Sequence, residues 1–199
     1  MLPIRLKLKK FKNYNFILGS NSPRRKEILK EIGLDFSVCP SNIDENFNKE
    51  MKLENIGVFL AEKKANAIKN ELKENDILIT ADTTVIHNNE LLSKPENTFQ
   101  AKQMLDKLSG KSHKVITGVC LLSKNRKCTF SCETIVTFND LDMRAIEFYI
   151  NKFKPFDKAG SYGIQEWIGL IGIEKIEGSY TNVVGLPASM LYTKLKKFI

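Results

Sequence analysis

The sequence predicts an α/β protein in which a mixed, twisted sheet is flanked by helices. The segment at 76–87 is rich in β-branched residues and has the composition of a buried strand interrupted by Asp82, and two further strands are predicted at 113–122 and 127–138. Other segments place apolar residues at helical spacing. Strands and helices follow one another without strict alternation, which favours a mixed sheet. The 199 residues and 42% hydrophobic content suit one domain over 1–199, built as a single body or as two fused lobes.

The first elements are a short strand at NFILGS and a helix directly after it. Ser22 is placed to cap this helix and Pro23 to occupy its first position, while Gly33 is placed to end it. A strand and a loop follow over 35–47. A second helix is expected over 55–73, and its apolar face is formed by Leu60, Ala61, Ala65, Ile68 and Leu72.

In the second half of the chain, Thr98 is predicted to cap a helix that Gly110 closes. The strands at 113–122 and 127–138 are separated by the polar turn SKNR, which predicts a hairpin. A further helix is expected at LDMRAIEFYINKF, ending near Pro155.

The glycine-rich stretch over 158–187 is expected to be strand-like with turns, and Pro187 is expected to open a last helix.

Charge and composition exclude some classes of protein. No apolar run approaches the roughly 20 residues that cross a bilayer. The basic N-terminus MLPIRLKLKKFKNYNF lacks the apolar core and cleavage site of a secretory signal. We interpret it as a solvated lead-in to the first strand, with a membrane-surface or nucleic-acid arm as the alternative. The net charge of +8 permits nucleotides, nucleic acid or acidic lipids as partners without choosing among them.

The cysteines predict no metal site. His87 and His113 do not lie near a cysteine pair at zinc-ligand spacing. In CTFSC, Cys128 and Cys132 should share one strand face with Phe130. We expect these two cysteines and the remaining two, Cys39 and Cys120, to be reduced packing residues, which fits a cytoplasmic protein.

The first chemical signal is the strand, loop and helix at residues 16–33. A helix N-terminus presents unpaired N–H groups and the positive end of the dipole, so Arg24 and Arg25 in the first turn are unfavourable there. A bound polyphosphate would compensate, and Ser20 and Ser22 add hydroxyl donors. The alternative is a capped helix with two solvated arginines. The segment has no GxxxxGK[ST] and is therefore not a P-loop.

The second signal is Asp82, which follows the apolar run ILITA and is expected at or near a strand end. It could hold a divalent cation or accept a proton from water, or simply form a turn. The polar turn HNNE predicts a hairpin that returns Lys94 towards Asp82, where it could neutralise phosphate. Lys64 is a similar candidate, and both lysines could instead be surface residues. Gln165 could bind a base edge or satisfy the backbone.

Six segments together resemble the Maf family: SNSPRRKEIL, LAEKKA, ITADTTV with LLSKP, LSGKSHKVITGV, KAGSYGIQ and GSYTNVVGLP. They occur in the family's order and extend from Phe16 to Pro187. The resemblance implies an α/β fold similar to inosine triphosphate pyrophosphatases, with a cleft between two lobes. It also implies hydrolysis of nucleoside triphosphates to monophosphate and pyrophosphate with Mg²⁺ or Mn²⁺, and it suggests a homodimer.

The resemblance also implies roles for individual residues. Asp82 matches the proposed proton acceptor of the family, and Arg24, Thr83 and Gln165 match positions linked to substrate choice. These three are similar to the branch acting on dTTP and UTP, whereas another branch acts on 7-methyl-GTP. The chain departs from the family pattern at Gly19 and Ser161, where alanine is usual, and at Glu166, where glycine is usual and which Trp167 follows.

A triphosphate repels an attacking hydroxide, so catalysis should rest on charge neutralisation and positioning. We expect phosphate oxygens to be bound by Arg24, Arg25, Lys64 and Lys94. Asp82 should orient or deprotonate the water that attacks the α-phosphorus. Asp82 is also the first candidate ligand of the metal ion, and Glu45 is the second. The alternatives are a nucleotide-sensing regulator of cell division without turnover, and a nucleic-acid binder. Dispersed lysines and the lack of an RNA-binding motif argue against the latter.

Overall fold

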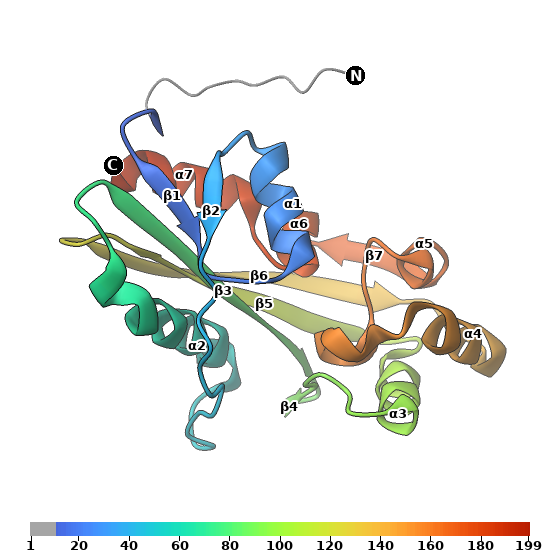
Figure 1. The fold of residues 1–199 in the computed structure, drawn as a ribbon. Helices are drawn as coiled ribbons and strands as arrows, with labels where there is room; N and C mark the ends of the chain where they lie inside the picture. The colour runs from blue at the N-terminus through green and yellow to red at the C-terminus, as the bar shows by residue number, and fades with distance from the viewer. Residues whose placement is uncertain (1–10) are drawn as a thin grey trace. The chain divides into compact units, whose positions relative to one another are not determined.

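The structure, a computed structural model, describes residues 11–199 (Figure 1). Within this range seven strands form one sheet in the order β2-β1-β3-β5-β6-β7, with β4 paired to β3 outside that path. β1 (Asn15–Leu18) pairs in parallel with both β2 (Phe36–Val38) and β3 (Asp76–His87). The predicted strand at NFILGS is therefore confirmed, and this part of the sheet is parallel.

Antiparallel pairing completes the sheet. β4 (Glu90–Leu91) pairs antiparallel with the end of β3, and β7 (Ile173–Glu177) pairs antiparallel with β6 (Lys127–Phe138). β5 (Ser112–Leu122) lies between β3 and β6. The predicted α/β class with a mixed sheet is confirmed.

The chain divides into two compact units. Unit 1 takes the described residues up to Asp82, together with Thr117–Cys132 and Gly185–Ile199. Unit 2 takes Thr83–Ile116 and Glu133–Val184. The strands β3, β5 and β6 each contribute residues to both units, so the division falls within strands and not in a linker.

The first helix of unit 1 begins and ends where the sequence predicts, whereas the second runs over Leu53–Ile68 and not over 55–73. In α1 (Pro23–Glu31), the Ser22 hydroxyl accepts the Arg25 N–H and Pro23 is the first helical residue. Gly33 follows with φ +78°, the left-handed conformation that ends a helix. α2 (Leu53–Ile68) and α7 (Ala188–Phe198) complete the unit, with a short 3₁₀ turn at Lys69–Glu71. Figure 1 shows α1 and α7 on one side of the strands and α2 on the other.

α2 packs directly on β5. Its predicted apolar face is buried, and Ala61, Ala65 and Ile68 pack with Leu78 and Cys120 of the strands. The backbones also touch, because a Cβ added to Gly118 would lie 2.1 Å from the Val58 nitrogen. Glycine at this position lets the helix approach the strand closely, and α2 is the helix that bears Lys64.

Unit 2 is built around four helices: α3 (Thr98–Leu108), α4 (Met143–Phe153), α5 (Trp167–Gly172) and α6 (Tyr180–Val184). Two 3₁₀ turns, Pro155–Asp157 and Ala159–Ser161, link α4 to α5. Its core brings buried apolar residues of these helices against β3, β5 and β6. Tyr149 of α4 is fully buried in this core.

Two predictions for unit 2 are wrong in part. The cap of α3 is Asn97, whose side chain accepts the Gln100 N–H at 2.9 Å, and Thr98 is the first helical residue. The stretch over 158–187 contains one strand, β7, but otherwise forms helices and turns. Its glycines serve close packing there: a Cβ on Gly169 of α5 would lie 1.9 Å from the Ile164 oxygen.

The predictions for the N-terminus and the cysteines have different outcomes. The interpretation of MLPIRLKLKKFKNYNF as a lead-in segment falls largely on residues 1–10, which lie outside the described residues. The four cysteines are free. Cys128 and Cys132 lie on the same face of β6 as Phe130, and the residues that alternate between these three are exposed on the other face.

Among residues 11–199, no helix combines the length and the apolar character that crossing a membrane requires.

Candidate active site

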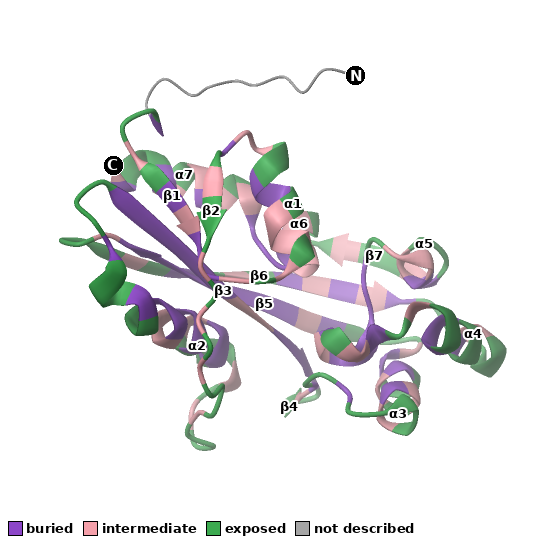
Figure 2. Cartoon of the chain, in the orientation of Figure 1, coloured by how far each residue is buried: buried purple, intermediate pink, exposed green. Residues whose placement is uncertain are grey.

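Asp82 lies midway along β3, so the prediction that it sits at or near a strand end is wrong. The strand runs for 12 residues from Asp76 to His87, and along it Asp82 and Thr83 are half-buried while the other residues are buried. Figure 2 shows β3 as a mostly buried strand. A carboxylate can occupy such a strand because an ammonium group pairs with it, as the position of Lys64 shows.

Lys64 places its ammonium group between two carboxylates. Its Nζ lies 2.6 Å from Asp82 Oδ1 and 2.7 Å from Glu45 Oε1. The side chains of Lys64 and Asp82 are 11% and 13% exposed, whereas Glu45 is 44% exposed. Lys64 is therefore a buried residue and not a surface lysine. Three predicted site residues, from a loop, a helix and a strand, meet at this point.

The two carboxylates offer oxygen ligands of the kind that a divalent cation prefers. Carboxylate oxygens are ligands that Mg²⁺ and Mn²⁺ prefer, and Mg²⁺ is usually held by one or two carboxylates together with phosphate oxygens and water. In the described part of the chain, no group of three or more His, Cys, Asp or Glu residues could hold a metal ion. Glu45 and Asp82 thus suit a cation that a phosphate ligand helps to bind, and they do not form a metal cage on their own.

Arg25 is held by the chain itself at the start of α1. Its Nε donates to the Gly185 carbonyl oxygen at 2.9 Å and its Nη1 donates to Ser20 Oγ at 3.2 Å. Burial lowers the pKa of Arg25, the charge of Asp82 opposes this shift, and the nearby Arg24 adds to it. An arginine still remains charged at any ordinary pH. The unfavourable cation in the first helical turn is therefore compensated partly by a carbonyl and a hydroxyl of the protein.

Arg24, beside it, is half-buried and lies close enough to Arg25 to affect its pKa. Glu45 also acts on the Arg25 pKa, in the same direction as Asp82. The structure thus gathers the six predicted residues of unit 1, namely Ser20, Arg24, Arg25, Glu45, Lys64 and Asp82. Two arginines, a lysine, two carboxylates and a hydroxyl make a set suited to a polyphosphate and a cation.

The glycine at position 19 has a steric reason. A Cβ added to Gly19 would lie 2.5 Å from the methyl group of Thr80 on β3. That methyl group cannot easily move away, because Thr80 is buried and its hydroxyl donates to the Ala61 carbonyl oxygen at 2.6 Å. Gly19 and Thr80 therefore form a matched pair immediately before Ser20.

The other predicted residues, Thr83, Lys94 and Gln165, belong to unit 2. The hairpin predicted at HNNE is confirmed by the pairing of Ile86 with Leu91. Lys94 follows it and is exposed. Thr83 is half-buried and directly follows Asp82 in the chain, and Gln165 is exposed at a turn before α5.

Sequence reasoning missed the residues that hold this turn. Tyr149 accepts the Gly163 N–H at 3.0 Å and donates to the carboxylate of Glu166. Lys158, which is also buried, lies 3.0 Å from the other oxygen of Glu166. The sequence signal for these contacts was Glu166 itself, at a position where the family usually has glycine. A carboxylate at such a position needs hydrogen-bond donors or a positive charge nearby.

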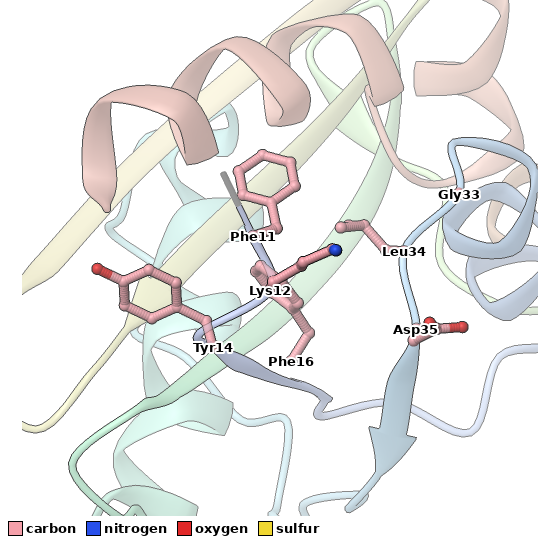
Figure 3. Close-up of a pocket in the computed structure, with 7 residues that line it drawn as sticks. All are labelled: Phe11, Lys12, Tyr14, Phe16, Gly33, Leu34 and Asp35. Atoms are coloured by element: carbon pink, nitrogen blue, oxygen red, sulfur yellow. The ribbon is translucent and has the colours of Figure 1, made fainter. Parts of the chain in front are cut away.

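A separate pocket in unit 1 contains none of the predicted residues (Figure 3). It is lined by Phe11, Lys12, Tyr14, Phe16, Gly33, Leu34 and Asp35. Its charged groups, Lys12 and Asp35, have opposite signs, so the pocket does not favour a polyphosphate.

Comparison with known proteins identifies the family. A protein of Phocaeicola vulgatus named dTTP/UTP pyrophosphatase is 49% identical over 191 residues, which is 96% of this chain and 99% of that protein. A protein of the same name from Flavobacterium psychrophilum is 50% identical over 94% of this chain and 96% of that protein.

A solved structure of a nucleoside-triphosphatase / dITP/XTP pyrophosphatase from Mycobacterium abscessus is a distant neighbour. It has 10% identity and a TM-score of 0.41 over 64% of this chain and 75% of that one, too low to support an argument. The family described as Maf-like protein matches residues 15–198, nearly the whole chain. This chain belongs to the Maf-like protein family.

Proposed function

We propose that this protein is a nucleoside triphosphate pyrophosphatase that prefers dTTP and UTP. The observation on which this rests is the Glu45–Lys64–Asp82 group, which lies near the arginines at the start of α1. The names of relatives that are 49% and 50% identical support the same activity. A protein that only sensed nucleotides would not need a carboxylate held this way by a buried lysine.

In the proposed reaction, water attacks the α-phosphorus and Asp82 accepts its proton. A new bond forms between the water oxygen and the α-phosphorus, and the bond from that phosphorus to the oxygen bridging to the β-phosphorus breaks. The products are a nucleoside monophosphate and pyrophosphate. Lys64 orients the Asp82 carboxylate through the 2.6 Å contact. A residue that moves a proton in this way typically contributes about 10²–10⁴ in rate.

Phosphate oxygens are the proposed ligands of Arg24, Arg25 and Ser20. Arg25 keeps its Nε and one Nη1 contact on the protein, so its position is set before a ligand arrives. Such preorganised charge lowers the barrier more than flexible charge does. Lys94, on unit 2, is proposed as a further phosphate ligand on the strength of the resemblance alone.

Glu45 and Asp82 are the proposed protein ligands of Mg²⁺ or Mn²⁺. The ion would neutralise phosphate charge and make pyrophosphate a better leaving group. Because the two carboxylates already share the Lys64 ammonium, binding at this place should be weak without a nucleotide.

The preference for dTTP and UTP is proposed from Arg24, Thr83 and Gln165. A site that hydrogen-bonds one base edge rejects a base that leaves its polar groups unpaired, by as much as about 10⁴–10⁵. An exposed amide such as that of Gln165 offers both a donor and an acceptor to a uracil-type edge.

The test is a screen of dTTP, UTP, CTP, GTP and 7-methyl-GTP with Mg²⁺ and with Mn²⁺, measuring pyrophosphate and orthophosphate separately. We expect pyrophosphate and a monophosphate, with the highest kcat/KM for dTTP and UTP. Orthophosphate and a diphosphate would show attack at the γ-phosphorus and refute the proposed reaction. A best rate with GTP or 7-methyl-GTP would refute only the substrate preference, and no turnover would favour a sensing role.

A further inference from the structure

Gln165 lies in a tight turn that has little freedom to move. The turn spans Gly163–Glu166 and is closed by the Glu166 N–H, which donates to the Gly163 oxygen at 3.0 Å. Gln165 is exposed, whereas Ile164 beside it is 5% exposed. On the other side, Gly169 of α5 packs so closely that a Cβ there would lie 1.9 Å from the Ile164 oxygen.

One hydroxyl group joins the two ends of this turn. The Tyr149 hydroxyl accepts the N–H of Gly163, the first residue of the turn, at 3.0 Å. It donates to the carboxylate of Glu166, the last residue. Tyr149 is itself fixed, because it is fully buried on α4 and its ring stacks on Phe153 with centroids 5.2 Å apart. We call Tyr149 and Glu166 the turn clamp.

A buried lysine completes the clamp. Lys158 Nζ lies 3.0 Å from Glu166 Oε1, and it also contacts Asp157 at 2.8 Å. The side chains of Lys158 and Glu166 are 9% and 19% exposed. Each oxygen of the Glu166 carboxylate thus has a largely buried partner, and a carboxylate held at both oxygens cannot rotate freely.

Burial raises the pKa of Tyr149 well above its usual range, and the hydrogen bond to Glu166 adds to this shift. The hydroxyl therefore keeps its proton and remains a donor at neutral pH.

We propose that Tyr149 and Glu166 are positioning residues that fix Gln165 for recognition of the nucleobase. The proposal rests on the proposed function, in which Gln165 contacts the base, and the two clamp residues act through the backbone of its turn. An amide discriminates between base edges only when its donor and acceptor are held in place, and a looser turn would let it adapt to other bases. The clamp therefore acts on selectivity and on substrate binding more than on the chemical step.

The first experiment compares Tyr149→Phe with the matched control Tyr162→Phe. Tyr162 is 6% exposed in the same unit, and its hydroxyl lies 2.7 Å from His113 Nε2, so its removal also deletes one buried hydroxyl. We expect Tyr149→Phe to lower the dTTP-to-GTP ratio of kcat/KM about tenfold, the order expected for lost hydrogen bonds, mainly through the KM for dTTP. Tyr162→Phe should change thermal stability similarly and leave that ratio within about twofold.

The second experiment is a double-mutant cycle with Gln165→Ala. If the clamp acts through Gln165, adding Tyr149→Phe to Gln165→Ala should not change the dTTP-to-GTP ratio further. Glu166→Gln, which keeps an acceptor for Tyr149, should retain more selectivity than Glu166→Ala. The Glu166 variants also serve if Tyr149→Phe does not fold, since Glu166 is less buried.

An unchanged ratio in Tyr149→Phe and Glu166→Ala, or fully additive effects in the cycle, would overturn the proposal and make the clamp purely structural. A Gln165→Ala variant with wild-type selectivity would overturn it as well. Pyrophosphate release by the wild-type protein would stand in each of these cases, so failure of the clamp and failure of the proposed reaction are distinguishable.

Discussion

Replacing Asp82 with asparagine tests the proposed proton acceptor directly. Asparagine has nearly the same shape and retains an oxygen that can accept from Lys64, but it has no charge and cannot accept a proton from water. We expect turnover to fall by about 10²–10⁴, the usual contribution of a general base. At saturating dTTP the loss should appear in kcat.

The structure sets the expected cost in stability. Removing one partner of a buried ion pair typically costs about 3–5 kcal/mol, because the other charge is left without compensation. Here Lys64 keeps its 2.7 Å contact with Glu45 after the substitution, so the full penalty does not arise. The asparagine oxygen can also still accept from Lys64, so the loss should be about 1 kcal/mol, the difference between a charge-assisted and an ordinary hydrogen bond. The variant should therefore fold, with a lower Tm.

A matched control lies on the same strand. Asp76 is 6% exposed, and it accepts from Asn15 Nδ2 at 3.1 Å and from the Lys73 N–H at 2.9 Å, so its role is structural. Asp76→Asn should lower Tm but keep turnover per folded molecule. The assay is pyrophosphate release from dTTP, with Tm measured for each variant. Near-normal turnover in Asp82→Asn, or an equal loss of turnover in Asp76→Asn, would refute the assignment of Asp82 as the base.

Three further predictions concern stability. Gly118→Ala should lower the free energy of unfolding by about 1–3 kcal/mol or more, because its Cβ would overlap the backbone of α2; a wild-type urea midpoint would contradict this close approach. Gly19→Ala should also destabilise the protein, because the added Cβ would lie 2.5 Å from the Thr80 methyl group. Adding Thr80→Ser removes that methyl group and should recover most of the lost stability. Strictly additive losses in the double variant would contradict the pairing of Gly19 with Thr80. Burial, reinforced by the charge of His87, lowers the pKa of His113 from 6.5 to about 3. As the pH falls, the unfolded chain therefore binds a proton at His113 before the folded protein does. The free energy of unfolding should then fall by about 1.4 kcal/mol per pH unit between about pH 6.5 and pH 3. In urea titrations from pH 4 to 7, His113→Gln should weaken this dependence, and parallel curves for the two proteins would show that His113 does not cause it.

Local signals predicted most of the elements correctly. Ser22, Pro23 and Gly33 mark the ends of α1 because capping and left-handed glycine depend on neighbouring residues only. The same holds for the apolar face of α2 and for the hairpin that the turn HNNE predicts. The α3 cap, which is Asn97 and not Thr98, is a local error of one residue, whereas the larger error lies where tertiary contacts outweigh local preference. The stretch over 158–187 appears strand-like in its residues, yet most of it forms turns and short helices.

The sequence by itself determined the α/β class, the family resemblance and the candidate site residues, because these depend on residue types and their order along the chain. Only the tertiary structure decided what those residues contact. It placed Asp82 within β3 and Lys64 between two carboxylates, since a buried strand can hold a charge once a distant helix supplies its partner. It also placed the hydroxyl of Tyr149, on α4, against the turn that ends at Glu166. Hydrogen bonds between residues far apart in the chain produce no periodic pattern in the sequence, so the spacing of residues does not predict them.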